Sequence, residues 1–148
     1  MATYADNRKA RFDYEILEKY EAGIELLGVE VKSVRGGRML LEGAFVIVRG
    51  GEAFLINAYI PPFQPQNVFA DYDPLRNRKL LLTKKEIAAL AGSERNKSLT
   101  IAPIALYNKG KKIKVEIALV RGKKKRDKRE DIKKREVGRE LRRMMKDR

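Results

Sequence analysis

The sequence predicts a mainly β fold with short α-helices (α+β): a small six-stranded antiparallel barrel of the OB-like type, plus a basic C-terminal tail that is disordered or helical. Short segments of alternating apolar and polar side chains recur through residues 1–120, and glycine-containing turns join several of them in pairs. Residues 121–148 are dominated by charge instead. A closed barrel is favoured because closure removes exposed sheet edges, and a sandwich is the alternative.

The first strands are predicted at residues 14–22 and 24–27. Period-two spacing puts four side chains of the first segment on one face of a half-buried strand: Tyr14, Ile16, Tyr20 and Ala22. Leu17 breaks this alternation, and Gly23 separates the two segments.

Two hairpins are predicted further along the chain, each with a glycine-containing turn: residues 44–49 with 52–60, and residues 99–107 with 112–120. Gly50-Gly51 forms the first turn, and Gly110 lies in the second. Strand alternation also predicts that Phe45 and Phe54 belong to the core.

A helix is predicted to begin at Thr83. Its hydroxyl can accept a hydrogen bond from the amide of Glu86, whose carboxylate can accept one from the amide of Thr83, as in a capping box. Three apolar residues then share one helical face, Ile87, Leu90 and Ala91. Gly92 is expected to end this helix. Residues 29–35 suit one helical turn, and four prolines mark residues 61–78 as a loop.

The charge is unevenly distributed along the chain. Lys and Arg number 34 against 20 Asp and Glu, which gives a net charge of +14. Residues 121–148 carry 15 of the basic residues and 6 of the acidic ones, so +9 of the total lies in this tail. We therefore expect two parts, a barrel at 1–120 and a tail at 121–148, and a polyanionic partner such as nucleic acid or an anionic membrane surface.

Several function classes are disfavoured by the composition. The chain has no histidine and no cysteine, so the usual triads, zinc sites and disulfides are absent. No glycine-rich stretch matches a phosphate-binding loop. We expect no catalytic residue, no metal and no cofactor, and hence not an enzyme. No apolar run is long enough for a membrane span or a secretory signal, so a cytoplasmic location is expected.

The tail carries one narrow apolar stripe at helical spacing: Val137, Leu141, Met144 and Met145. Gly138 and the dense positive charge make this helix marginal in isolation. We expect it to be unfolded when free and helical against a polyanion. The alternative is a solvated basic tail that supplies only non-specific attraction.

Five stretches of the sequence carry a family resemblance: NRKARFDY at 7–14, YEAGIELLGVEVKSVRGG at 20–37, GEAFLINAYI at 51–60, DPLRNRKLLLTKKEI at 73–87 and RGKKKRDKREDIKKRE at 121–136. Together they resemble small protein B, the SsrA-binding proteins of bacterial trans-translation, across almost the whole chain. The resemblance implies an OB-like barrel that binds the tRNA-like domain of transfer-messenger RNA (tmRNA). It also implies delivery of alanyl-tmRNA, with elongation factor Tu, to stalled ribosomes, and a tail that enters the decoding centre and message channel.

The resemblance further implies RNA contacts at two places. In the barrel they are Glu21, Leu81 and Thr83. Where the barrel meets the tail they are Gly122, Lys123, Lys124, Arg126, Asp127, Lys128 and Arg129. A carboxylate such as Glu21 can accept hydrogen bonds from base amines or 2′-hydroxyls. Without the family pattern, Glu21 would read as a solvated strand residue, Leu81 as core and Thr83 as a helix cap alone.

Some positions depart from the family pattern. Thr83 stands where relatives commonly carry Asn or His, and Arg126 stands where His or Tyr commonly stacks on ribosomal RNA. A guanidinium can also stack on bases. Val137 replaces a tryptophan of many tails, which weakens anchoring there. Phe12 stands where His is common.

The prediction is a non-catalytic adaptor, a monomer with no membrane partner, that binds tmRNA and the ribosomal RNA of the decoding centre. A ribosomal protein or general RNA chaperone would use a small barrel and a basic tail equally well. A carboxylate-dependent nuclease is the enzyme alternative, and it would need clustered acids and a divalent metal.

Overall fold

The computed structural model describes residues 2–63 and 71–123. The mainly β class with short helices is confirmed, although the described residues contain seven strands where six were expected. The strands are β1 (Thr3–Asp6), β2 (Tyr14–Ile24), β3 (Phe45–Arg49), β4 (Glu52–Ile56), β5 (Arg78–Leu81), β6 (Leu99–Lys109) and β7 (Lys112–Gly122). The helices are α1 (Arg8–Asp13), α2 (Gly28–Arg35) and α3 (Lys84–Glu94). The predicted tail helix lies outside the described residues.

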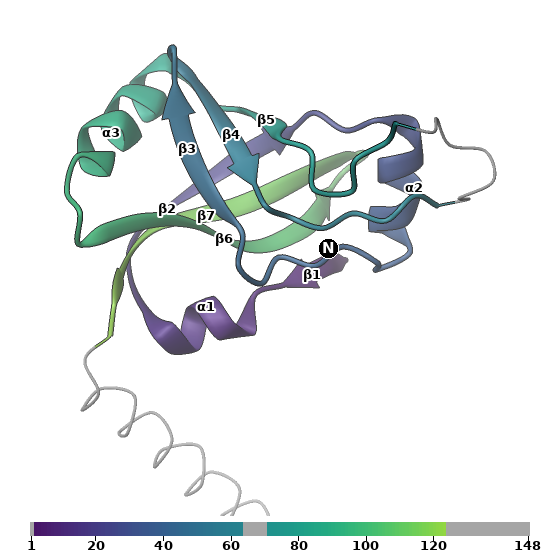
Figure 1. The fold of residues 1–148 in the computed structure, drawn as a ribbon, viewed down its shortest axis with the longest axis horizontal. Coiled ribbons are helices and arrows are strands. Elements are labelled where there is room, and N and C mark those ends of the chain that lie inside the picture. Colours follow the sequence, from purple (N-terminus) through teal and green to yellow (C-terminus); the bar gives the residue numbers. More distant parts are fainter. Residues whose placement is uncertain (1, 64–70, 124–148) are drawn as a thin grey trace, which may run out of the picture.

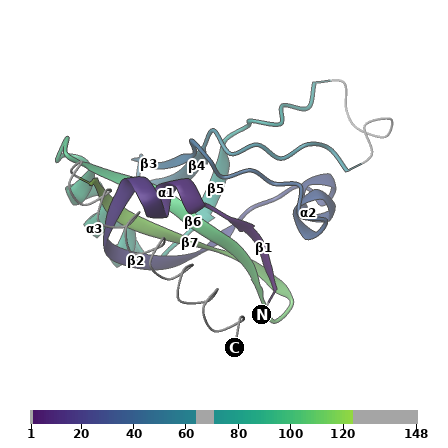
Figure 2. The same cartoon turned by 90° about the horizontal axis from the view of Figure 1, so that it is seen from below.

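The strands form one antiparallel sheet in the order β1-β6-β7-β2-β5-β4-β3. The sheet curls so that β3, at one edge, packs against β6, which is not its neighbour in the hydrogen-bonded order (Figure 1). This closure encloses a core to which every part of the sheet contributes, including Val46, Leu55, Leu80, Leu106 and Ile117. Helices α2 and α3 lie at opposite ends of the sheet in both views (Figure 2). Within the described stretches, no helix has the length and apolar character needed to cross a bilayer.

The segment predicted as two strands at 14–22 and 24–27 is the single strand β2, which ends at Ile24. Its register against β7 shifts between Ile16 and Glu18, so Leu17 is the extra residue of a β-bulge. The bulge reverses the alternation. Tyr14 and Ile16 pack on the small cluster beneath α1, whereas Tyr20 and Ala22 face the main core. The prediction that these four side chains share one face is therefore wrong.

Helix α1 and strand β1 were not predicted, and tertiary contacts explain both. Asn7 is buried, and its side-chain oxygen accepts a hydrogen bond from the amide of Ala10 at 3.1 Å, which caps α1. Its side-chain nitrogen donates to the carbonyl of Pro103 at 2.9 Å, and its backbone amide donates to that of Ile104 at 2.8 Å. Both carbonyls lie at a bulge of β6. One asparagine thus begins the helix and fastens it across the sheet.

The two hairpins are confirmed as β3–β4 and β6–β7. The capping box at Thr83 is confirmed as well, although α3 continues past Gly92 to Glu94. The possible turn at 29–35 is the helix α2, which buries Val34. The expected loop at 61–78 ends earlier than predicted, because Arg78 is already the first residue of β5.

A buried ion pair joins α2 to β5. The side chains of Glu30 and Arg78 are both fully buried, and the guanidinium Nε donates to the Glu30 carboxylate at 2.9 Å. Arg78 also donates to the carbonyls of Ala58 at 2.6 Å and Pro74 at 3.0 Å. Arg76 provides a second guanidinium to the same carboxylate. Glu30 therefore joins α2 to β5, and Arg78 joins β5 to the chain on both sides of the proline loop.

Glu30 remains ionised in this setting. Burial by itself raises the pKa of Glu30, but hydrogen bonds from Arg76, the Leu27 amide and Arg78 outweigh it, so the net shift of the pKa is downward. The Tyr72 hydroxyl lies 3.1 Å from the Glu30 carboxylate and 2.8 Å from the carbonyl of Ile60. It therefore extends the network to the segment that follows β4.

Replacing Glu30→Gln should destabilise the protein by about 3–5 kcal/mol, because it leaves the Arg78 charge buried without a carboxylate. Urea unfolding at neutral pH measures this loss. The control is Glu15→Gln, which removes the 2.7 Å ion pair to Arg121, where both side chains are about half exposed. An exposed pair of this kind contributes at most about 1 kcal/mol.

The same variant should also change the response to acid. Because the folded-state pKa of Glu30 is lowered, its stabilisation is complete above its ordinary value of 4.5 and is lost as the pH falls through the folded-state value. The variant should lack this component of the acid-induced loss of stability.

Equal effects of Glu30→Gln and Glu15→Gln at neutral pH would show that the buried pair does not hold the fold.

Candidate nucleic-acid interface

Three of the predicted contact residues line one groove. Glu21 on β2, Leu81 at the end of β5 and Thr83 at the start of α3 border a hollow of about 570 Å³. Glu21 and Leu81 lie on paired strands, since Gly23 of β2 is opposite Leu81 in the register. The fold therefore brings together residues that are 60 positions apart in the sequence.

Leu81 is exposed because of strand alternation on β5. Arg78 and Leu80 point inward and are buried, so Leu81 points outward and is 50% exposed. A Cβ atom on Gly23 would lie only 3.2 Å from the Cβ of Leu81. The glycine of the Glu-Ala-Gly motif thus allows the leucine side chain to lie close over β2. The reading of Leu81 as a core residue is wrong.

Thr83 has the role of a helix cap in this structure. Its hydroxyl oxygen accepts from the amide of Glu86 at 3.2 Å, and its own amide donates to the Glu86 carboxylate at 3.0 Å. The hydroxyl also lies 3.0 Å from the same carboxylate, to which it can donate. An RNA contact through Thr83 stays a prediction, and it would have to share this hydroxyl with the cap.

The carboxylate of Glu21 is oriented by two neighbours on β6. The Tyr107 hydroxyl donates to one oxygen, and the Lys109 ammonium lies 3.0 Å from the other. The hydrogen bond from Tyr107, and then that from Lys109, lowers the pKa of Glu21. Burial, and then the hydrogen bond to Glu21, raises the pKa of Tyr107. Glu21 is therefore an ionised, accessible acceptor with a defined orientation.

The junction residues lie at the other end of the same strand pair. Gly122 is opposite Tyr14 in the β2–β7 register, whereas Glu21 is opposite Glu116. Six positions along β7, at about 3.3 Å each, separate the two places by roughly 20 Å. The Lys123 amide donates to the carbonyl of Asp13 at 2.9 Å, which holds the chain against α1 where it leaves the sheet. Five predicted residues lie outside the described residues: Lys124, Arg126, Asp127, Lys128 and Arg129.

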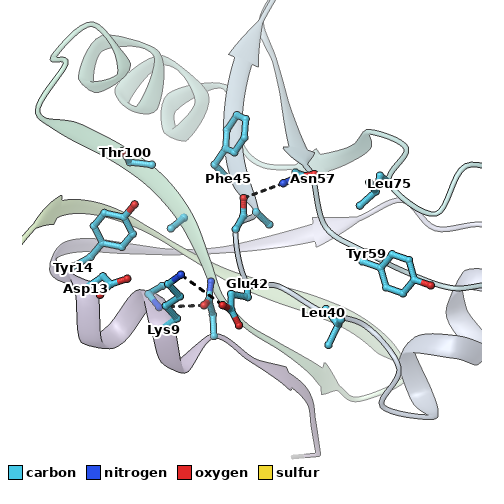
Figure 3. A pocket seen from close by; sticks show the side chains of 15 residues that line it. Lys9, Asp13, Tyr14, Leu40, Glu42, Phe45, Asn57, Tyr59, Leu75 and Thr100 are labelled. Atoms are coloured by element: carbon cyan, nitrogen blue, oxygen red, sulfur yellow. Dashed lines mark hydrogen bonds and ion pairs between the residues drawn. The ribbon is translucent and has the colours of Figure 1, made fainter.

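A second hollow, of about 750 Å³, was not found by sequence reasoning. Four exposed apolar side chains line it: Leu40, Phe45, Tyr59 and Leu75 (Figure 3). Phe45 is 38% exposed, so its predicted core position is wrong. Residues 44–48 are all apolar, and alternation alone therefore could not decide which of them face inward. Lys9, at the rim, pairs with Glu42 at 3.6 Å. The exposed aromatic rings of Phe45 and Tyr59 can stack on planar groups of a ligand.

The backbone of this second hollow is shaped by Asn57, which has a positive φ of 63°. Its side chain donates to the carbonyl of Gly43 at 3.3 Å (Figure 3). Asparagine tolerates this conformation better than most residues. The contact ties the end of the β3–β4 hairpin to the segment that leads into it.

Comparison with known proteins identifies the family. The family model described as SmpB protein matches residues 4–147. An SsrA-binding protein of Microcystis aeruginosa is 52% identical over 141 residues, which are 95% of this chain and 92% of that protein. The SsrA-binding protein of Gloeobacter violaceus is 54% identical over 140 residues, with 95% and 91% covered. That of Enterococcus faecalis is 49% identical over 142 residues, with 96% and 92% covered.

A solved structure agrees with these sequence relatives. Its description reads "tmRNA-SmpB: a journey to the center of the bacterial ribosome". Its matching chain is 48% identical and has a TM-score of 0.68, and the match covers 81% of this chain and 84% of that one. The resemblance drawn from the sequence motifs is confirmed. This chain belongs to the SmpB protein family, whose matched members are named SsrA-binding proteins.

Proposed function

We propose that this chain binds the tRNA-like part of tmRNA through the groove of Glu21, Leu81 and Thr83, and that it serves ribosome rescue by trans-translation. The convergence of these three residues on one hollow carries the proposal. The names of the relatives and the solved tmRNA-SmpB structure support the same ligand.

The chemistry of the groove suits bases and sugars better than phosphates. An ionised carboxylate repels phosphate but accepts hydrogen bonds from base amines and 2′-hydroxyls. The exposed Leu81 side chain offers an apolar surface beside Glu21 for a base or ribose. Lys79 lines the same groove, and its ammonium is 3.3 Å from Glu52. The groove therefore recognises features that distinguish one RNA from another.

The two-part organisation follows from where the chain leaves the sheet. Strand β7 continues through Gly122, and the basic segment follows the anchored Lys123 amide. Residues 1–120 form the tmRNA-binding barrel in this proposal, and residues 121–148, with their net charge of +9, engage ribosomal RNA. The protein acts in the cytoplasm as a monomeric adaptor for alanyl-tmRNA and elongation factor Tu, without catalysis of its own.

Recovering RNA with the tagged protein from cells tests the function directly. We expect tmRNA to be enriched far above its share of total RNA, because groove contacts add specificity to the general attraction of a basic protein. Recovery of ribosomal RNA in proportion to its abundance, without tmRNA enrichment, would instead support a ribosomal protein or general RNA chaperone.

Glu21→Ala should weaken tmRNA binding by roughly tenfold or more, since a hydrogen bond to a charged group is lost. Glu116→Ala is the matched control. It removes the same charge from the residue opposite Glu21 in the register, but Glu116 does not line the groove. Both changes make the protein more positive, so simple attraction to RNA would tighten binding in both variants.

Binding isotherms and thermal melting separate the outcomes. The melting temperature of Glu21→Ala should change little, because the partners of the carboxylate are on the surface. Equal binding by the two variants would argue against the Glu21 contact. A large fall in melting temperature would show that Glu21 is structural.

A chain that ends after Lys125 should fold, bind tmRNA and fail to support peptide tagging on stalled ribosomes. The barrel keeps its complete sheet, whereas most of the positive tail is removed. Normal tagging by this truncated chain in a reconstituted translation system would contradict the division into two functional parts.

A further inference from the structure

Exposed apolar side chains gather at the second hollow, the one shown in Figure 3. Among residues 2–63 and 71–123, eight large apolar side chains are exposed, and four of them line this hollow of about 750 Å³. They are Leu40, Phe45, Tyr59 and Leu75. The backbones of Leu40 and Tyr59 pair through hydrogen bonds of 2.9 and 3.1 Å, so these two side chains lie next to each other. A gathered apolar surface of this kind is typical of a site that binds an apolar partner.

The charged groups at this hollow indicate what kind of partner fits. Two carboxylates line it, those of Asp13 and Glu42, against the single ammonium of Lys9 among its described lining residues. The lining is therefore net acidic in a chain whose overall charge is +14. Carboxylates repel phosphate, so the backbone of RNA does not suit this surface. An apolar segment with basic residues around it does.

The tail of the same chain has this chemistry. Residues 121–148 carry 15 basic residues against 6 acidic ones, and these charges surround one apolar stripe: Val137, Leu141, Met144 and Met145. Methionine side chains adapt to irregular surfaces, and their sulfur atoms make favourable contacts with aromatic rings such as those of Phe45 and Tyr59. The stripe and the hollow are therefore complementary in both polarity and charge.

The tail also begins at this hollow. The Lys123 amide donates to the carbonyl of Asp13 at 2.9 Å, and Asp13 lines the hollow. Thirteen residues separate Lys123 from Val137, and an extended chain of that length spans up to about 45 Å. The stripe can therefore reach the hollow from its point of attachment. Such a tether gives an effective concentration on the order of 1 mM, so a contact with a Kd of about 0.1 mM would favour the docked tail roughly tenfold.

We propose that the apolar stripe of the tail docks as a helix in the hollow of Leu40, Phe45, Tyr59 and Leu75 of the same molecule when no RNA is bound. The hollow then orders the stripe before a polyanion does, in place of the unfolded free tail expected from its charge. RNA phosphates release the tail because they compete for its basic residues. The inference goes beyond the proposed function and rests on it only for the RNA that releases the tail.

Amide hydrogen exchange of the free, full-length protein tests the docking. The test variant combines Leu40→Ser and Leu75→Ser. The control combines Leu17→Ser and Leu27→Ser, which replaces two leucines that are 39% and 46% exposed, against 60% and 44% in the test variant, and that do not line the hollow. Thermal melting verifies that both variants are folded.

Exchange at residues 137–145 should be slowed roughly tenfold in the wild type and in the control, as the tethered contact requires. The test variant should lose this protection. Unprotected amides in the wild type, protection that survives in the test variant, or equal losses in both variants would overturn the proposal.

A spin label measures the same contact with the hollow intact. The chain has no cysteine, so Arg148→Cys provides a single attachment point three residues beyond the stripe. A nitroxide there should broaden the NMR signals of Leu40, Tyr59 and Leu75 strongly, and the hollow variant should lose most of this broadening. Equal broadening in both would mean that the tail only passes nearby, and the docking site would be wrong.

Two further arms identify the occupant and its release. Isotope-labelled chain without nitroxide is mixed with unlabelled chain that carries it, and broadening in this mixture would assign the hollow to the tail of a second copy and overturn docking within one molecule. Adding a short single-stranded RNA should remove the broadening, whereas persistence would overturn release by phosphate. The docking measurements contain no RNA, so their failure would leave the proposed tmRNA contact of Glu21 unaffected.

Discussion

The buried pair of Glu30 and Arg78 is the interaction on which the rest of the architecture depends. Two oppositely charged side chains without solvent exposure are stable only when nearly all of their hydrogen bonds are made inside the protein. Here the carbonyls of Ala58 and Pro74 complete the set around the guanidinium. The pair therefore fixes α2, β5 and both ends of the proline loop at once. It also places the two motifs GVEVKS and DPLRNRK, which lie far apart in the sequence, in direct contact.

This buried pair determines how the residues of the candidate interface are oriented. Because Arg78 must point inward, alternation along the short strand β5 leaves Leu81 pointing outward. The capping box of Thr83 then begins α3 two residues later and sets the far wall of the groove. On the other wall, Tyr107 and Lys109 hold Glu21. Many of the charged and polar side chains near the groove thus hold other protein groups in place, and only a few remain available to a ligand.

The features that could be predicted from the sequence are those that depend on residues close together in the chain. Both hairpins and the Thr83 cap follow from turn glycines, alternation and capping chemistry within a few residues of one another. The features that were missed depend on distant partners. Strand β5 begins with a buried arginine whose charge is balanced by Glu30, from a distant helix. Asn7 fastens α1 to a bulge in β6, and the bulge at Leu17 reverses the faces of β2. Glu21, Leu81 and Thr83 were named from family motifs.

The pairing of Tyr107 with Glu21 keeps the charge of these two side chains constant across the physiological pH range. The pKa of Glu21 is lowered and that of Tyr107 is raised, so neither group changes its charge between about pH 5 and 8. The chain also has no histidine, the side chain that ordinarily titrates in that interval. Acidification of a stressed cell would therefore leave the charge of these two groups unaltered. The proposed RNA contact of Glu21 therefore does not depend on a change in the charge of this carboxylate within that interval.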